Sequence, residues 1–204
     1  MKSENQKKQT NKILRLTETA ILIAIAVVLN ELSVIKFPFG GSVTVFSQVP
    51  IILLAFRYGT PWGLLSGIIM GIFQMMFGLK NFSYVTGIAS YMILAFTDYI
   101  CAFGVLGLGG VFRNKIKSQP IALACGGAFV SVLRLAFHFI SGVTIWKGYA
   151  PSNSIGAIVK YSITYNSSYM IPELIVTVIG VFALGKIFDF TSRDITAKRN
   201  KKAE

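Results

Sequence analysis

Residues 120–145 read PIALACGGAFVSVLRLAFHFISGVTI, and this stretch decides the fold class. It exceeds the roughly 20 residues that a helix needs to cross a bilayer core of about 30 Å. Its only basic side chains are Arg134 and His138, and it has no acidic one. The stretch therefore predicts a membrane-spanning helix that carries two polar groups inside the membrane.

Similar apolar runs fill most of the chain, and charged residues separate them. The second run is the shortest. These runs predict an all-α integral membrane protein of six transmembrane helices over residues 13–188, flanked by basic tails at 1–12 and 189–204. The expected spans are Ile13–Leu32, Val43–Phe56, Pro61–Phe77, Tyr84–Phe112, Pro120–Ile145 and Ile158–Phe188.

The composition agrees with a membrane protein. Of 204 residues, 53% are hydrophobic and 14% are charged, and the mean hydropathy is +0.63. An average soluble domain is roughly 25% charged. Too few polar residues are present to build the outer shell of a soluble domain of this length.

The basic residues predict the orientation, because Lys and Arg concentrate in cytoplasmic loops. With six spans both ends share one side, and the two basic tails place that side in the cytoplasm of a multi-pass cell-membrane protein. The net charge of +12 belongs to these membrane-flanking segments, so no nucleic-acid partner is expected. The cytoplasmic side would hold Lys2, Lys7, Lys8, Lys12, Arg15, Arg57, Arg113, Lys115, Lys117, Lys186, Arg193, Lys198, Arg199, Lys201 and Lys202. The opposite side would hold Lys36, Lys80, Lys147 and Lys160.

Soluble catalytic motifs are absent from the sequence. It has no Walker loop, no H-E-x-x-H and no G-x-S-x-G, so we expect no enzyme activity and no ATP hydrolysis by this chain. Cys101 and Cys125 fall inside expected spans and imply no disulfide framework. Acidic residues are too sparse for an inorganic-ion site, and no metal or other cofactor is expected.

Polar residues inside spans are costly and usually face a protein interior, so they are the candidates for function. Asp98 lies midway along the fourth span, and the other candidates lie in the outer halves of the fifth and sixth. An acid beside aromatic rings suits an organic cation, and an Asn suits the edge of a heterocycle. The candidates are Asp98, Arg134, His138, Asn166 and Glu173, with Trp146 and several tyrosines near the outer ends.

Structural roles remain open for several of these residues. Asp98 could pair with Arg134, which would leave no negative charge for a ligand. Trp146 and Tyr149 could belong to an interfacial aromatic belt. Glu173 could be a polar packing contact.

Two stripes of small residues have the spacing that lets membrane helices approach closely. Gly63, Gly67 and Gly71 repeat every four residues on the third span, and internal packing is the favoured interpretation. Ala20 and Ala24 have the same spacing on the first span.

Several segments resemble the thiamine-specific substrate-binding (S) component of energy-coupling factor transporters. The most specific are His138-Phe-Ile-Ser-Gly-Val-Thr-Ile-Trp146, then Tyr149, then Tyr161-Ser-Ile-Thr-Tyr-Asn166. Leu16-Thr-Glu-Thr-Ala20 with Ala24, Gly40-Gly-Ser-Val43 and the Asp98-Tyr99 pair extend the resemblance over nearly the whole chain.

The resemblance implies a six-helix protein that binds thiamine from outside and delivers it to a membrane scaffold subunit and two cytoplasmic ATPases. It implies that Asp98 lies near the cationic substrate and that Trp146 stacks on the thiazolium ring. His138, Tyr161 and Asn166 would hydrogen-bond the ligand. Tyr99 and Tyr149 would line the pocket, and Ala20 and Ala24 would form the docking face for the scaffold.

The chain departs from the family at two positions. Some members have a Trp in the first outer loop, where this chain has Phe37 and Phe39. Some carry Glu where this chain has Asp98. An S-component for another heterocyclic vitamin or a thiamine precursor remains open, as does a self-sufficient secondary carrier of organic cations.

Overall fold

The structure is a computed structural model that describes residues 2–191 and 196–197, with side chains over 12–191. Most of the basic tail expected at 189–204 lies outside the described residues. Among those residues, five helical stretches are long and apolar enough to cross a membrane. The chain is therefore an all-α membrane protein, as the sequence predicts.

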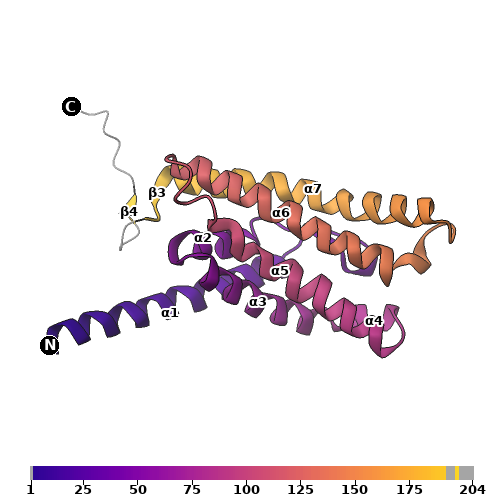
Figure 1. Ribbon diagram of the computed structural model, residues 1–204, viewed down its shortest axis with the longest axis horizontal. Coiled ribbons are helices and arrows are strands. Elements are labelled where there is room, and N and C mark those ends of the chain that lie inside the picture. Colours follow the sequence, from indigo (N-terminus) through magenta and orange to yellow (C-terminus); the bar gives the residue numbers. More distant parts are fainter. Residues whose placement is uncertain (1, 192–195, 198–204) are drawn as a thin grey trace.

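The helices pack as an elongated bundle in which α6 and α7 run side by side (Figure 1). Two short antiparallel strand pairs lie outside the helices. The helices are α1 (Lys2–Glu31), α2 (Val49–Tyr58), α3 (Thr60–Phe77), α4 (Ile88–Ile93), α5 (Ala102–Gly104), α6 (Gln119–Thr144) and α7 (Ile155–Ile187). The strands are β1 (Ile35–Lys36), β2 (Ser42–Val43), β3 (Phe188–Asp189) and β4 (Thr196–Ala197). Shorter helical turns are η1 (Pro38–Gly40), η2 (Leu79–Tyr84), η3 (Leu94–Cys101), η4 (Val105–Gly110) and η5 (Lys147–Tyr149).

The second expected span, Val43–Phe56, is helical only in its C-terminal part. Helix α2 covers only Val49–Tyr58, and ten residues of helix rise about 15 Å, half the thickness of a bilayer core. The preceding residues 44–48 are not helical, although Thr44, Ser47 and Gln48 are buried. The run looked continuous because both parts are apolar or uncharged.

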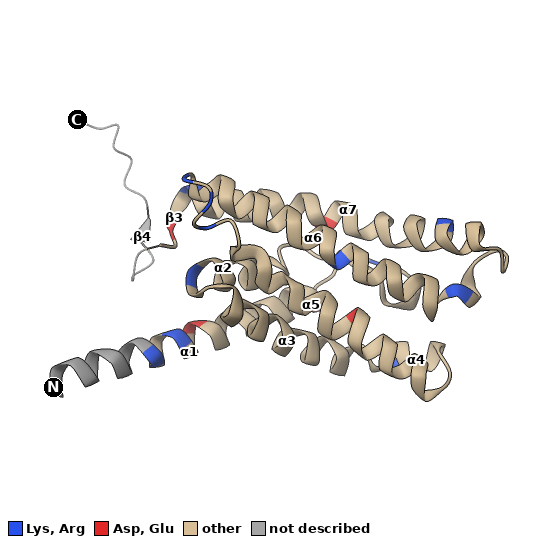
Figure 2. Ribbon diagram, in the orientation of Figure 1, with Lys and Arg blue, Asp and Glu red and all other residues tan. Residues whose placement is uncertain are grey.

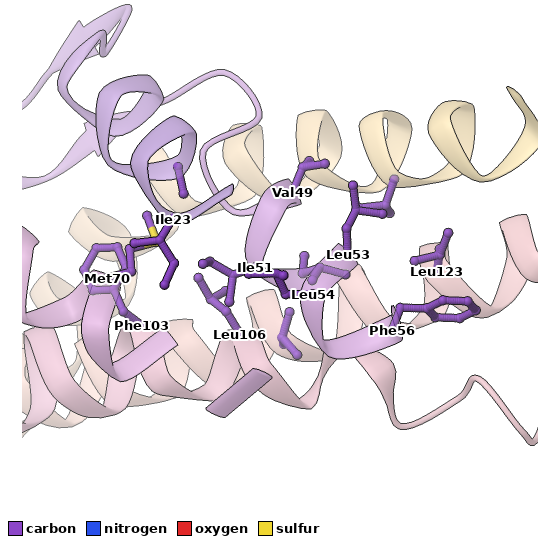
Figure 3. Packing of buried hydrophobic residues seen from close by; sticks show 14 of the residues in the cluster. Ile23, Val49, Ile51, Leu53, Leu54, Phe56, Met70, Phe103, Leu106 and Leu123 are labelled. Carbon is purple, nitrogen blue, oxygen red and sulfur yellow. The ribbon is translucent and has the colours of Figure 1, made fainter. Parts of the chain in front are cut away.

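Helix α2 forms the centre of the core. Every residue from Val49 to Phe56 is buried, which explains why its sequence is apolar on all sides. Its side chains meet Ile23 of α1, Met70 of α3 and Leu123 of α6 in one cluster (Figure 3). The short helix therefore joins the N-terminal helices to the α6–α7 pair.

The fourth span is one continuous but irregular helix, Ile88–Gly110. It begins as α4, widens into the π-helical stretch η3, and narrows to a 3-10 turn at η4. Stretches with π-helical bonding are rare and often occur at functional sites. Asp98 and Tyr99 both lie in η3.

The glycine stripe of α3 packs against this irregular span, so the expected internal packing is confirmed. A Cβ at Gly71 would lie 2.6 Å from the Tyr99 carbonyl oxygen, and one at Gly63 would lie 2.7 Å from that of Gly107. Gly67 meets the carbonyl oxygens of Phe103 and Gly104 in the same way. The stripe thus lets the two backbones touch and fixes the position of η3.

Basic residues gather at one end of the bundle, around the α2–α3 turn and the start of α6 (Figure 2). There the Arg57 Nε donates to Glu18 of α1 at 2.8 Å, and Arg113 Nη1 donates to the Arg57 carbonyl oxygen at 2.7 Å. The β1–β2 hairpin, which includes Lys36, follows the C-terminal end of α1.

Candidate functional site

A cavity of about 450 Å³ opens between the β1–β2 hairpin and helices from both halves of the chain. Its volume falls within the roughly 300–1,000 Å³ typical of small-molecule sites. Lining residues that the sequence predicts are Asp98, Tyr99, His138, Trp146, Tyr161 and Asn166. Lining residues that the prediction omits include Asn30, Phe39, Gln74, Asn81, Tyr165 and Tyr169.

Asp98 is held by three side chains from α6 and the turn that follows it. Its Oδ1 lies 2.8 Å from His138 Nδ1, and its Oδ2 accepts from Ser141 Oγ at 2.6 Å. Trp146 Nε1 donates to the same Oδ2 at 3.1 Å. The fourth span and α6 are thereby joined at the acid that the sequence predicts for a cation.

His138 has one ring nitrogen still available for a ligand. A carboxylate only accepts hydrogen bonds, so Nδ1 carries the proton shared with Asp98. In the neutral ring Nε2 then bears the lone pair, and this atom is buried without a hydrogen-bond partner in the structure. An N–H or O–H group of a ligand can reach this atom only after the side chains around the ring move.

The alternative that Asp98 pairs with Arg134 is wrong. Arg134 Nη1 instead donates to Glu173 Oε2 of α7 at 2.8 Å. Both side chains are buried, and Glu173 also accepts hydrogen bonds from Thr44 and Ser47. Arg134 therefore does not neutralise Asp98, whose carboxylate contacts His138 instead.

Aromatic side chains close the cavity beside Asp98. Phe39 lies at the centre of this cluster, with ring centroids 5.8 Å from Trp146 and 4.2 Å from Tyr149. Its φ of +63° is unusual for a bulky residue and costs of the order of 1–3 kcal/mol. Phe39 lies in the connection between α1 and α2, where some members of the resembled family have Trp.

Tyr149 is not one of the residues that line the cavity, contrary to the prediction. Its ring packs on the outer side of the cluster against Phe39, and its hydroxyl donates to the Tyr84 carbonyl oxygen at 2.9 Å. The 3-10 turn η5 directly follows Trp146 and contains Tyr149, and it sets the position of this ring. Tyr149 therefore supports the aromatic cluster from behind.

Asn166 lines the cavity but already makes several internal hydrogen bonds. Its Nδ2 donates to the carbonyl oxygens of Ser162 at 2.9 Å and His138 at 3.2 Å. Its Oδ1 accepts from Tyr169 at 2.7 Å. Asn166 thereby fixes α7 against the turn of α6 that carries His138.

The tyrosines on α7 form a wall that the sequence prediction captured only in part. Tyr161 stacks on Tyr165 at a centroid distance of 5.9 Å, and Tyr165 contacts Tyr169 at 5.7 Å. The spacing of four residues was the available signal, because it puts all three on one helix face. Tyr165 also bonds to Pro38 and to the Gly41 amide in the hairpin.

A polar wall faces the tyrosines from α1, α3 and η2. Asn30 Nδ2 donates to Gln74 Oε1 at 2.6 Å, and Asn81 Nδ2 donates to the Tyr99 hydroxyl at 2.9 Å. Tyr99 in turn donates to the Gly78 carbonyl oxygen at 3.1 Å. The sequence prediction missed Asn30 and Gln74, which lie in spans without any motif around them.

The two small-residue stripes have different surroundings. Ala20 and Ala24 are exposed on α1, beside exposed Ile21 and Ile25. They line no part of the cavity. An exposed stripe of this kind is available to another helix, unlike the buried glycines of α3.

Comparison with known proteins agrees with this geometry. The family described as Thiamine transporter protein (Thia_YuaJ) matches residues 16–191. The chain is 34% identical over 182 residues to the thiamine transporter ThiT of Bacillus subtilis (strain 168), covering 84% of this chain and 90% of that protein. It is 25% identical over 189 residues to ThiT of Lacticaseibacillus paracasei, covering 85% and 88%.

The fold also matches a solved structure. ThiT from Listeria monocytogenes superposes with a TM-score of 0.68, at 23% identity, over 86% of this chain and 94% of that one. The family match covers the cavity and nearly all described helices. With its polar cavity between membrane helices, the chain belongs to the thiamine transporter protein family.

Proposed function

We propose that this protein binds thiamine in the cavity and delivers it, as an S-component, to an ATP-driven energy-coupling factor transporter in the cell membrane. The observation that carries the proposal is the Asp98 carboxylate, held by His138, Ser141 and Trp146 at the wall of an aromatic cavity. Thiamine has a permanently cationic thiazolium ring. A buried carboxylate with aromatic faces attracts such a ring.

Each lining group has a role in this proposal. Trp146 and Phe39 offer faces for the two ligand rings, and Phe39 takes the place of the Trp found in some relatives. The unpartnered His138 Nε2 accepts from the amino group of the pyrimidine. The Tyr161–Tyr165 stack closes the side of the ring that faces α7.

The proposal includes partners for ATP hydrolysis. The relatives are named as thiamine transporters, and the sequence of this chain has no nucleotide-binding motif. A scaffold subunit and two cytoplasmic ATPases would supply the energy. The exposed alanines Ala20 and Ala24 support a docking face on α1, because small residues let a partner helix approach closely.

We also propose six crossings of the membrane with both termini in the cytoplasm. The second crossing would combine the non-helical segment 44–48 with α2. The Arg57–Glu18 pair supports this topology, since it sets the end of α2 level with the middle of α1. The basic cluster at that end of the bundle has the bias expected of a cytoplasmic face (Figure 2).

The test is a thiamine titration followed by intrinsic fluorescence. The chain has two tryptophans, and Trp62 lies near Arg15 and Thr19, away from the cavity. In a Trp62→Phe variant, thiamine should quench the remaining Trp146 with saturation at one ligand per chain. Absence of saturable quenching and of binding by calorimetry would refute the proposal.

Competition and transport experiments separate the alternatives. If the pyrimidine precursor binds more tightly than thiamine, the protein is specific for the precursor. If purified protein in liposomes carries thiamine down a gradient without ATP, it is a self-sufficient carrier. An S-component should bind thiamine but leave it outside such vesicles.

A further inference from the structure

An arginine lines a cavity that we propose binds a cation. Arg134 brings a guanidinium group to the cavity, and it lies one helical turn from His138 on the same face of α6. An uncompensated guanidinium here would repel a cationic ligand. It would also compete with that ligand for the Asp98 carboxylate.

Glu173 supplies the compensating charge from outside the cavity. Its Oε2 accepts from Arg134 Nη1 at 2.8 Å, and only 1% of the residue is exposed. Glu173 is not one of the residues that line the cavity. Its effect on a ligand must therefore act through Arg134.

The surroundings of Glu173 fix it in that role. Its Oε1 accepts hydrogen bonds from Thr44 and Ser47, so both carboxylate oxygens are occupied. On the other side, the guanidinium carbon of Arg134 lies 4.6 Å from the centre of the Phe103 ring. These contacts hold Arg134 toward Glu173 and leave Asp98 to His138, Ser141 and Trp146.

We propose that Glu173 is a specificity-determining residue: by neutralising Arg134, it gives the cavity a net preference for a cationic ligand. Glu31, Lys36 and Lys80 also line the cavity, but they are exposed to the outside. The charged side chains that lie deeper are Asp98 and Arg134, and Glu173 offsets the charge of Arg134. The preference for positive charge then rests on Asp98. This inference rests on the proposed function, in which the cation is thiamine.

The test compares one charged and one neutral probe on the full-length protein in detergent micelles. The probes are thiamine and its analogue in which an uncharged thiophene ring replaces the thiazolium. Glu173→Gln keeps an acceptor oxygen for Thr44 and Ser47 but removes the charge and the oxygen that accepts from Arg134 Nη1. Thiamine affinity should fall about tenfold or more. The repulsion between two unit charges at a partly buried site is large enough to cause a loss of that size.

The neutral analogue separates charge from packing. Its affinity should change by less than about threefold, because no charge of its own meets the freed guanidinium. Equal losses for both probes would show that Glu173 acts only by holding the segment 44–48, and would overturn the inference. Unchanged thiamine affinity would overturn it as well.

Two further variants complete the test. Glu173→Asp keeps the charge and should retain the wild-type ratio of thiamine to analogue affinity. Arg134→Leu with Glu173→Gln removes both charges and should restore that ratio to within about threefold. If the single Gln variant does not fold, this double variant still decides, since a ratio shifted toward the analogue contradicts the inference. Wild-type protein that binds neither probe would instead refute the proposed function.

Discussion

Asp98 and His138 lie 40 residues apart in the sequence, yet Asp98 Oδ1 and His138 Nδ1 are 2.8 Å apart in the structure. The contact joins the irregular fourth span to α6 across one wall of the cavity. It also leaves His138 Nε2 buried without a hydrogen-bond partner among the described residues. A ligand with a positive ring and an adjacent N–H donor would meet both groups at once.

Asp98→Asn should weaken thiamine binding by roughly 10- to 100-fold, corresponding to the loss of about 1.5–3 kcal/mol for bonds to a charged group. The amide keeps an oxygen for Ser141 or Trp146, so the melting temperature should change little. Calorimetric titration and thermal unfolding measure the two quantities. Glu31→Gln is the matched control, because Glu31 is an exposed acid that also borders the cavity. Equal losses in the two variants would contradict a special role for Asp98.

Trp146→Ala should cost more affinity than the roughly 0.5–2 kcal/mol of one cation–π contact, because stacking area is lost as well. Trp146→Phe should retain part of the stacking but lose the 3.1 Å bond from Nε1 to Asp98. We therefore expect affinities in the order wild type, Phe, Ala, measured by calorimetry. Phe and Ala variants of equal affinity would mean that only the indole N–H matters.

Gly71→Ala should destabilise the protein by about 1–3 kcal/mol, the usual cost of overpacking. The added Cβ would lie 2.6 Å from the Tyr99 carbonyl oxygen, so η3 must move and take Asp98 with it. Thermal unfolding should show the loss of stability, and titration should show weaker thiamine binding.

Gly156→Ala is the control for that substitution. Gly156 lies in α7, and a Cβ added there would meet no atom within 4 Å, so Ala should be neutral or stabilising by up to about 1 kcal/mol. If both alanines behave alike, contact between α3 and the fourth span does not position the site.

Ala20→Trp and Ala24→Trp should leave thiamine binding by purified protein unchanged within about twofold, because neither residue lines the cavity. Both should abolish uptake in cells and co-purification with a scaffold and ATPases, because a bulky group holds a partner helix away. Ala136→Trp is the matched control, since Ala136 is an exposed alanine on α6. Normal uptake by the Ala20 and Ala24 variants would remove the docking face from α1.

Cysteine labelling in intact cells tests the topology, in a background that lacks Cys101 and Cys125. Lys80→Cys and Ser152→Cys should react with a membrane-impermeant reagent, and Lys115→Cys should react only after the cells are opened. Lys80 and Ser152 lie in connections at the end away from the basic cluster. The reverse pattern would place the termini outside.

The long helices could be predicted closely because apolar length alone specifies a transmembrane helix. The fifth and sixth expected spans, Pro120–Ile145 and Ile158–Phe188, differ from α6 and α7 by a few residues at most. The bounds of the second span failed because hydropathy does not distinguish a helix from an irregular, partly buried turn. The π-helical η3 was equally invisible, since nothing in its composition sets it apart from α-helix.

Individual site residues were predictable, but their partners were not. Asp98 and His138 stood out as polar groups in apolar spans, whereas the choice between Glu173 and Asp98 as partner of Arg134 depended on how α6 and α7 rotate. Helix rotation is a tertiary property, set here by contacts such as Asn166 to the His138 carbonyl oxygen. Asn30 and Gln74 were missed for the same reason.

The break before α2 has a consequence for how the chain assembles. Residues 44–48 are not helical, and lipid offers no partners for free backbone polar groups. Their side chains bond to Glu173 and Ser131, on helices made much later in synthesis. A nascent chain that ends before α6 lacks these partners. The segment before α2 can therefore form its final side-chain hydrogen bonds only once α6 and α7 have been made.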